Sequence, residues 1–255
     1  MTSLPVPATT RARDVLAAEW LKLRTVRSTY LMLLLAVAGT AAVGLFATAR
    51  AKVDSPVYFD AVEISLSGAV ISQLAFGVFG ALAITTEHTT GMIRTTFAAV
   101  PRRRAVLAAK ATVTGLLTLA VGEVIAFGTF FLGQRELSSA HLDVGLADPG
   151  VLRAVAGAGF YLFVMAVVGL CLGTIIRHTA GAIAAIGVIF IEPLFVLTGF
   201  PAWLKDSVLW WAGQAIMSSR PRPGYPSASL GFIVCGVYAV LGLAAATFVI
   251  TRRDA

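Results

Sequence analysis

The sequence predicts an all-α membrane protein with six transmembrane helices. Apolar residues make up 58% of its 255 residues, and the mean hydropathy of +0.85 lies outside the range of soluble globular domains. Six apolar stretches of about 20 residues or more are each long enough, at about 1.5 Å per residue, to cross a hydrocarbon core of roughly 30 Å. The basic residues lie in short segments beside these stretches, which is typical of membrane topology signals. The net charge of +7 therefore does not indicate a nucleic-acid partner.

The N-terminal part of the chain precedes the first apolar stretch. Residues 1–10 are rich in Pro, Thr and Ala and predict a disordered tail, whereas residues 11–255 predict a single transmembrane domain. Within residues 11–28, Trp20 falls on an apolar helix face, and Lys22 and Arg24 lie next to it in the sequence. This pattern predicts an amphipathic helix in the headgroup plane. An ordinary basic flank before a span fits the same pattern.

The six predicted spans and one further apolar segment follow in order. The spans cover about residues 30–49, 66–86, 107–132, 151–176, 180–200 and 228–250. The first apolar stretch exceeds the usual length of a signal-peptide core, so an uncleaved span is predicted. Between the fifth and sixth spans, residues 201–217 are apolar and carry Trp203, Trp210 and Trp211. Because tryptophan prefers the membrane interface, this segment predicts a re-entrant outer element, and an ordinary outer loop anchored by its aromatic residues is the alternative.

The distribution of Lys and Arg sets the predicted orientation. Thirteen of the 20 basic residues fall in the N-terminal segment, the segment between spans two and three, the link between spans four and five, and the C-terminal tail. The remaining seven share the other three loops with most of the acidic residues. The positive-inside rule therefore places both termini in the cytoplasm.

The segment between spans two and three, residues 87–110, predicts a short cytoplasmic helix. Ile93, Phe97 and Val100 recur at helical spacing on one face, with Arg94 off it. Thr89 or Thr90 is expected to cap this helix, and a proline at position 101 is expected to end it. A surface helix resting on lipid headgroups is the simpler interpretation. Three arginines then reach the membrane surface: Arg102, Arg103 and Arg104.

Two acidic residues lie inside predicted spans. Glu123 falls in the third span and Glu192 in the fifth, where an ionised carboxylate costs about 2.5–3.5 kcal/mol on insertion scales. Pro193 removes a backbone donor next to Glu192 and predicts a helix break there. These three residues are candidates for a translocation path. A structural role, with the carboxyl hydrogen-bonded to a neighbouring span or protonated, is the alternative.

The sequence lacks the motifs of an ATPase or of a metal site. A P-loop requires GxxxxGK followed by Ser or Thr, and none of the four lysines is followed by either residue. The three histidines are widely separated, and the two cysteines lie inside apolar stretches. We therefore expect no catalytic residue, cofactor or metal in this chain.

Three stretches resemble the ABC-2 type permeases of ATP-binding-cassette exporters, in particular the small bacterial permeases of the multidrug or antibiotic-resistance type. They are Glu19-Trp20-Leu21-Lys22-Leu23-Arg24, Gly91-Met92-Ile93-Arg94-Thr95-Thr96, and Val100-Pro101-Arg102-Arg103 leading into Ala108-Ala109-Lys110. The resemblance covers the whole chain. It implies six spans, an N-terminal connecting helix, a cytoplasmic coupling helix between spans two and three, and re-entrant helices between spans five and six.

The resemblance also implies a function and partners. Residues 87–100 would be the element that docks on an ABC ATPase subunit, which binds ATP and Mg in place of this chain. A second permease copy, identical or homologous, would complete the transporter in a bacterial cytoplasmic membrane and export an amphiphile such as a drug, a peptide antibiotic or a lipid. The implied ATPase-coupling residues are Glu87, Gly91, Ile93, Arg94, Phe97 and Val100.

Two other functions stay open at this stage. An ion-coupled secondary transporter would use Glu123 or Glu192, and it predicts inverted halves with matched helix breaks. A break candidate is present in the fifth predicted span, with no counterpart in the second. A non-transporting membrane scaffold would leave the helical 87–100 segment without a role.

Overall fold

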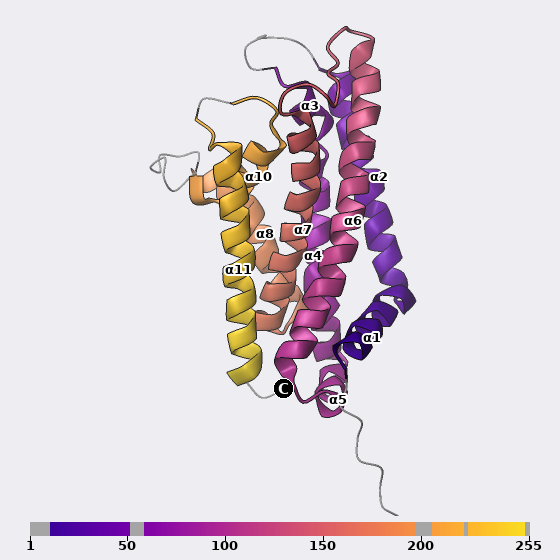
Figure 1. Cartoon of the computed structure of the whole chain (residues 1–255), viewed down its shortest axis with the longest axis vertical. Helices are drawn as coiled ribbons and strands as arrows, with labels where there is room; N and C mark the ends of the chain where they lie inside the picture. Colours follow the sequence, from indigo (N-terminus) through magenta and orange to yellow (C-terminus); the bar gives the residue numbers. More distant parts are fainter. Residues whose placement is uncertain (1–10, 52–58, 197–205, 222–223, 253–255) are drawn as a thin grey trace, which may run out of the picture.

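The computed structural model describes residues 11–51, 59–196, 206–221 and 224–252, and all regular secondary structure within them is helical. The predicted disordered tail, residues 1–10, lies outside the described residues. The long helices run side by side in an elongated bundle (Figure 1). We call the end of the bundle that carries α1 and α5 the α5 end, and the opposite end, which carries α3, the α3 end.

The chain enters the bundle through two helices that meet at an elbow. α1 (Ala12–Thr25) confirms the helix predicted before the first span, and α2 (Arg27–Ala49) contains that span. Val26 between them has an extended backbone, with φ −86° and ψ 110°. Because one extended residue interrupts the hydrogen-bond ladder, α1 lies obliquely across the α5 end while α2 runs along the bundle (Figure 1).

The remaining helices follow the predicted order. They are α3 (Ala61–Ser65), α4 (Ala69–Thr89), α5 (Met92–Ala99), α6 (Arg103–Ser138), α7 (Val151–Ile176), α8 (Thr179–Val196), α10 (Leu209–Met217) and α11 (Ala228–Arg252). Five helices of the described chain are long and apolar enough to cross a membrane: α2, α4, α6, α7 and α11. The fifth predicted span overlaps α8, whose apolar described part, Thr179–Ile189, is shorter. The count of six spans therefore stays a prediction.

The boundaries of two predicted spans differ from the helices. α6 has 36 residues and is about 54 Å long, well beyond the predicted span 107–132. Helix-forming residues continue past the apolar stretch at both ends, so the helix outlasts its apolar part. The second predicted span, 66–86, began too early, because the separate turn of α3 occupies the chain up to Ser65 and α4 begins at Ala69.

α7 forms the centre of the bundle, and small residues hold α4 against it. Tyr161, Leu162 and Met165 of α7 are each 1% exposed. A Cβ added at Gly169 of α7 would overlap the carbonyl oxygen of Gly77 in α4, so the two backbones touch. The small residues of α7 therefore serve packing within the subunit.

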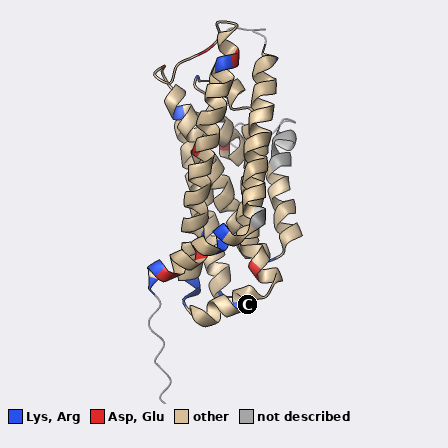
Figure 2. Ribbon diagram, turned by 90° about the vertical axis from the view of Figure 1, so that its right-hand side faces the viewer, with Lys and Arg blue, Asp and Glu red and all other residues tan. Residues whose placement is uncertain are grey.

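Charged residues gather mainly at the two ends of the bundle, and the helices between them are mostly uncharged (Figure 2). At the α3 end, Asp60 caps α3 by accepting from the backbone N–H groups of Val62 and Glu63. Its other oxygen accepts from the Ser219 and Arg220 backbone N–H groups. This carboxylate fixes the chain that leaves α10. α10 lies within the predicted re-entrant segment 201–217, of which residues 201–205 are outside the described residues.

Candidate functional site

α5 is a separate two-turn helix at one end of the bundle. It begins after Gly91, whose φ of 71° is left-handed and favours glycine, and it ends at Val100 before a proline. The predicted cap is wrong, because Thr89 is the last residue of α4 and Thr90 is the C-cap of α4. The predicted short helix and its end before proline are confirmed.

The apolar face of α5 is turned toward its own chain. Ile93 is 3% exposed, and Phe97 packs against a buried cluster that includes Leu107 of α6 and Ile250 of α11. The exposed residues of α5 and its start are Gly91, Met92, Arg94, Thr95, Ala98 and Ala99. Ile93 and Phe97 of the predicted coupling residues thus face the bundle and Val100 is half-buried, and their role in coupling stays a prediction. An isolated apolar stripe is buried by whichever surface is nearest, and here that surface is the bundle.

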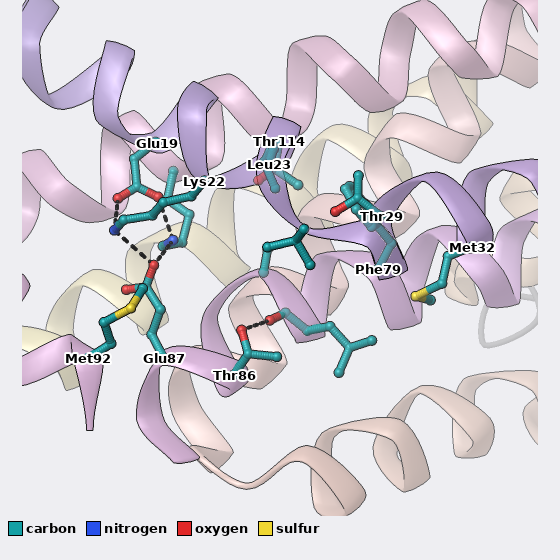
Figure 3. Close-up of a pocket in the computed structure, with 14 residues that line it drawn as sticks. Glu19, Lys22, Leu23, Thr29, Met32, Phe79, Thr86, Glu87, Met92 and Thr114 are labelled. Atoms are coloured by element: carbon teal, nitrogen blue, oxygen red, sulfur yellow. Dashed lines mark hydrogen bonds and ion pairs between the residues drawn. The ribbon is translucent and has the colours of Figure 1, made fainter. Parts of the chain in front are cut away.

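Glu87, in the last turn of α4, belongs to a buried cluster of four charges beside α5. Its Oε1 accepts from Lys22 Nζ of α1 at 2.9 Å and from Lys110 Nζ of α6 at 2.8 Å. Glu19 of α1 completes the cluster, since its two oxygens accept from Lys22 at 2.6 Å and from Lys110 at 2.5 Å (Figure 3). We call these four residues the charge cluster. It joins α1, α4 and α6 at one point.

The charge cluster has no net charge, since it contains two carboxylates and two ammonium groups, and it is largely shielded from solvent. The side chains of Glu19, Glu87 and Lys110 are each 4% exposed, and that of Lys22 is 28% exposed. Removing one partner of a buried ion pair typically costs about 3–5 kcal/mol, because the other charge stays buried. Desolvation lowers the pKa of Lys22, but its hydrogen bonds to Glu19 and Glu87 outweigh this, and the pKa lies above its usual value.

One carboxylate oxygen of the charge cluster has no partner in the described part of the chain. Glu87 Oε1 accepts from both lysines, whereas Glu87 Oε2 accepts no hydrogen bond there. Glu87 as a residue is 3% exposed. Leaving a buried acceptor without a hydrogen bond costs about 1–3 kcal/mol, and more when the acceptor is charged. A donor from outside the described chain would therefore stabilise this oxygen.

The cationic residues predicted at the membrane surface divide into exposed and inward-facing ones. Trp20 is 45% exposed, and Arg24, Arg102 and Arg104 are also exposed. Lys22 is half-buried because two carboxylates attract its ammonium, and its place at the membrane surface stays a prediction. Arg103 is half-buried: it donates to the backbone oxygen of Ile250 at 3.3 Å and lies 5.2 Å from the centre of the Phe97 ring. Arg103 therefore ties α5, α6 and α11 together.

The translocation-path candidates are only partly described. Glu123 is half-buried, and its carboxyl group lies against Gly159 of α7, where the absence of a side chain leaves room for it. Its Oε2 accepts no hydrogen bond from the described residues. Glu192 and Pro193 lie within the helical backbone of α8, but their side chains are outside the described residues.

Sequence reasoning missed Glu19 and Lys110 as functional candidates. Lys110 was counted with the basic loop, although it lies three residues inside the predicted third span, where a charge needs a buried partner. The Glu19 to Lys22 spacing of three residues is a helical ion-pair signal that the sequence did contain. Their convergence with Glu87 depends on tertiary packing.

Comparison with known protein families gives one match. Residues 15–194 match the profile of a family described as ABC-2 family transporter protein. The match covers well over half of the chain and includes most of α1, all of α5 and the charge cluster. It confirms the resemblance stated from the sequence. No curated protein matches this chain significantly.

Proposed function

Because the chain belongs to the ABC-2 family of transporter proteins, we propose that it is the permease subunit of an ATP-driven exporter, with α5 as its contact to a separate ATPase. The main support for this proposal is the form and exposure of α5. It is a short helix flanked by two non-helical links, and its outer face, with Arg94, Thr95 and Ala98, is exposed at one end of the bundle. The sequence has no P-loop, so nucleotide would be hydrolysed in the partner.

The charge cluster connects α4, which leads directly into α5, to α1 and α6. Only Thr90 and Gly91 separate α4 from α5, and Glu87 lies one turn before this link. Since Glu87 binds Lys110 of α6 and Lys22 of α1, a displacement of α5 by a docked ATPase would act on three helices together. A buried ion-pair cluster resists separation strongly enough to serve this purpose.

The remaining parts of the proposal follow the family. The α5 end would face the cytoplasm of a bacterial cell, consistent with the excess of Lys and Arg there, and both termini would lie on that side. A second permease copy, identical or homologous, would pair with this one. The cargo would be an amphiphile such as a drug, a peptide antibiotic or a lipid, because the spans carry few charges.

The test is partner binding by variants of the exposed α5 face. The expected partner is a P-loop ATPase without apolar spans, encoded in an adjacent reading frame and co-expressed with the tagged permease. Arg94→Glu or Ala98→Glu is expected to abolish co-purification and permease-dependent ATPase activity, because both residues are exposed. Arg135→Glu, an exposed arginine near the α3 end, is the matched control. Normal binding and activity in both α5 variants would disprove the coupling assignment.

A further inference from the structure

A pocket lies at the elbow between α1 and α2. α4, α6 and the start of α5 form its other sides. Its cavity volume is about 90 Å³, room for a small polar group and not for a whole drug-sized ligand, and it is open on one side. One wall is the charge cluster, and the other is apolar, with Val26, Phe79 and Leu82. Figure 3 labels Phe79 of the apolar wall and Glu19, Lys22 and Glu87 of the charge cluster. Met92 of α5 also lines it. The pocket therefore combines a polar head and an apolar wall, as an amphiphile does.

Glu87 supplies the specific chemistry of this pocket. It lines the pocket, is 3% exposed, and keeps one oxygen without a donor from the described residues. A carboxylate oxygen can only accept, so the missing partner carries an N–H or O–H group. An ammonium gives the stronger bond, because both partners are then charged.

The charge balance of the pocket favours a zwitterion over a simple cation. The charge cluster contains two carboxylates and two ammonium groups, so an added cation alone would leave an unbalanced charge in a buried site. Lys22 is the most exposed member, with a side chain 28% exposed, and it can donate to a phosphate oxygen. The apolar wall comes from helices long and apolar enough to span a membrane, where acyl chains are available.

We propose that this pocket binds the headgroup of an ethanolamine-type phospholipid. The ammonium donates to Glu87 Oε2, the phosphate accepts from Lys22, and an acyl chain lies along Phe79 and Leu82. The flexible Met92 side chain moves aside when the headgroup enters. Because Met92 belongs to α5, the bound lipid then contacts α5. The proposal requires α1 to lie at the membrane surface, and it is independent of any ATPase partner.

The experiment measures lipid binding by the wild-type permease. Native mass spectrometry of the detergent-solubilised full chain is used with four dioleoyl lipids whose heads carry decreasing numbers of N–H groups: phosphatidylethanolamine, its N-methyl and N,N-dimethyl derivatives, and phosphatidylcholine. The first three are expected to occupy one site about tenfold or more tightly than phosphatidylcholine, which has no N–H donor. Equal binding of dimethyl lipid and phosphatidylcholine, or binding of free dodecylamine without any phospholipid, would overturn the proposal.

Three variants locate the site. Glu87→Gln is expected to abolish the preference for N–H lipids, and Leu82→Trp is expected to weaken binding of all four lipids by filling the apolar part. Glu136→Gln, which changes an exposed carboxylate near the α3 end, is expected to keep the preference. A preference that persists in both pocket variants would place the lipid elsewhere. If Glu87→Gln does not fold, the wild-type lipid series and Leu82→Trp decide the question.

Discussion

The charge cluster makes a strong prediction for Lys110→Met. Methionine has a similar length and packs well in an apolar site, so the substitution removes mainly the charge. The Lys110 side chain is 4% exposed and contacts Glu19 at 2.5 Å and Glu87 at 2.8 Å. Without it, two buried carboxylates share the single remaining Lys22. We expect the free energy of unfolding to fall by about 3–5 kcal/mol.

The assay is unfolding of the purified chain in mixed micelles by a titrated denaturing detergent, followed by far-ultraviolet circular dichroism. The matched control is Arg104→Met, an exposed residue two turns earlier in α6, which is expected to change stability by about 0.5 kcal/mol or less. If Lys110→Met lost no more stability than this control, the charge cluster would not be a stabilising unit.

A double variant separates charge imbalance from lost packing. Lys110→Met leaves a net charge of −1 in the charge cluster, and adding Glu19→Gln restores neutrality, with Lys22 still bound to Glu87. The double variant is expected to recover about 0.5–3 kcal/mol relative to Lys110→Met alone. Additive losses from the two substitutions would show that packing, and not charge balance, determines the cost.

Three further substitutions test other parts of the fold. Gly91→Ala meets no atom within 4 Å but must keep a φ of 71°, so it should cost about 1–2 kcal/mol in the same titration and reduce binding of the ATPase; unchanged stability would refute the need for glycine at the start of α5. Gly169→Ala should sharply reduce the yield of folded protein in size-exclusion chromatography, because its Cβ overlaps the carbonyl oxygen of Gly77; a wild-type elution profile would contradict the close α4–α7 contact. Asp60→Ala removes the cap of α3 and the bonds to Ser219, and it should cost about 2–3 kcal/mol; faster proteolysis of the segment after α10 is the second readout, and wild-type resistance would count against this role.

Hydropathy predicted most of the helical architecture because spans are determined locally. An apolar stretch of about 20 residues must satisfy its backbone internally in lipid, so the boundaries of α7 agree with the predicted 151–176. α6 was predicted too short because helix propensity continues where hydropathy ends. The α1–α2 elbow at Val26 had no proline or glycine to indicate it, since its extended backbone accompanies packing of α1 against α6.

The candidate site was predicted less completely than the fold. Helical periodicity found the apolar stripe of α5 but not the bundle surface that buries Ile93. Glu87 was chosen as part of the coupling segment, and its partners Lys22 and Lys110 lie 65 and 23 residues away in the sequence. A single sequence gives the identity of charged residues but not which distant ones meet.

α6 connects the two polar ends of the bundle without interruption. Lys110 near its start belongs to the charge cluster. Gln134 near its end donates to the Ser65 hydroxyl of α3 and accepts from the Val144 backbone N–H. These two residues are 24 positions apart, about 36 Å along a continuous helix. A helix held by buried polar contacts at both ends cannot shift at one end without straining or breaking contacts at the other. A displacement that begins at α5 therefore has a physical route to α3 that does not depend on the less buried helices α2 and α11.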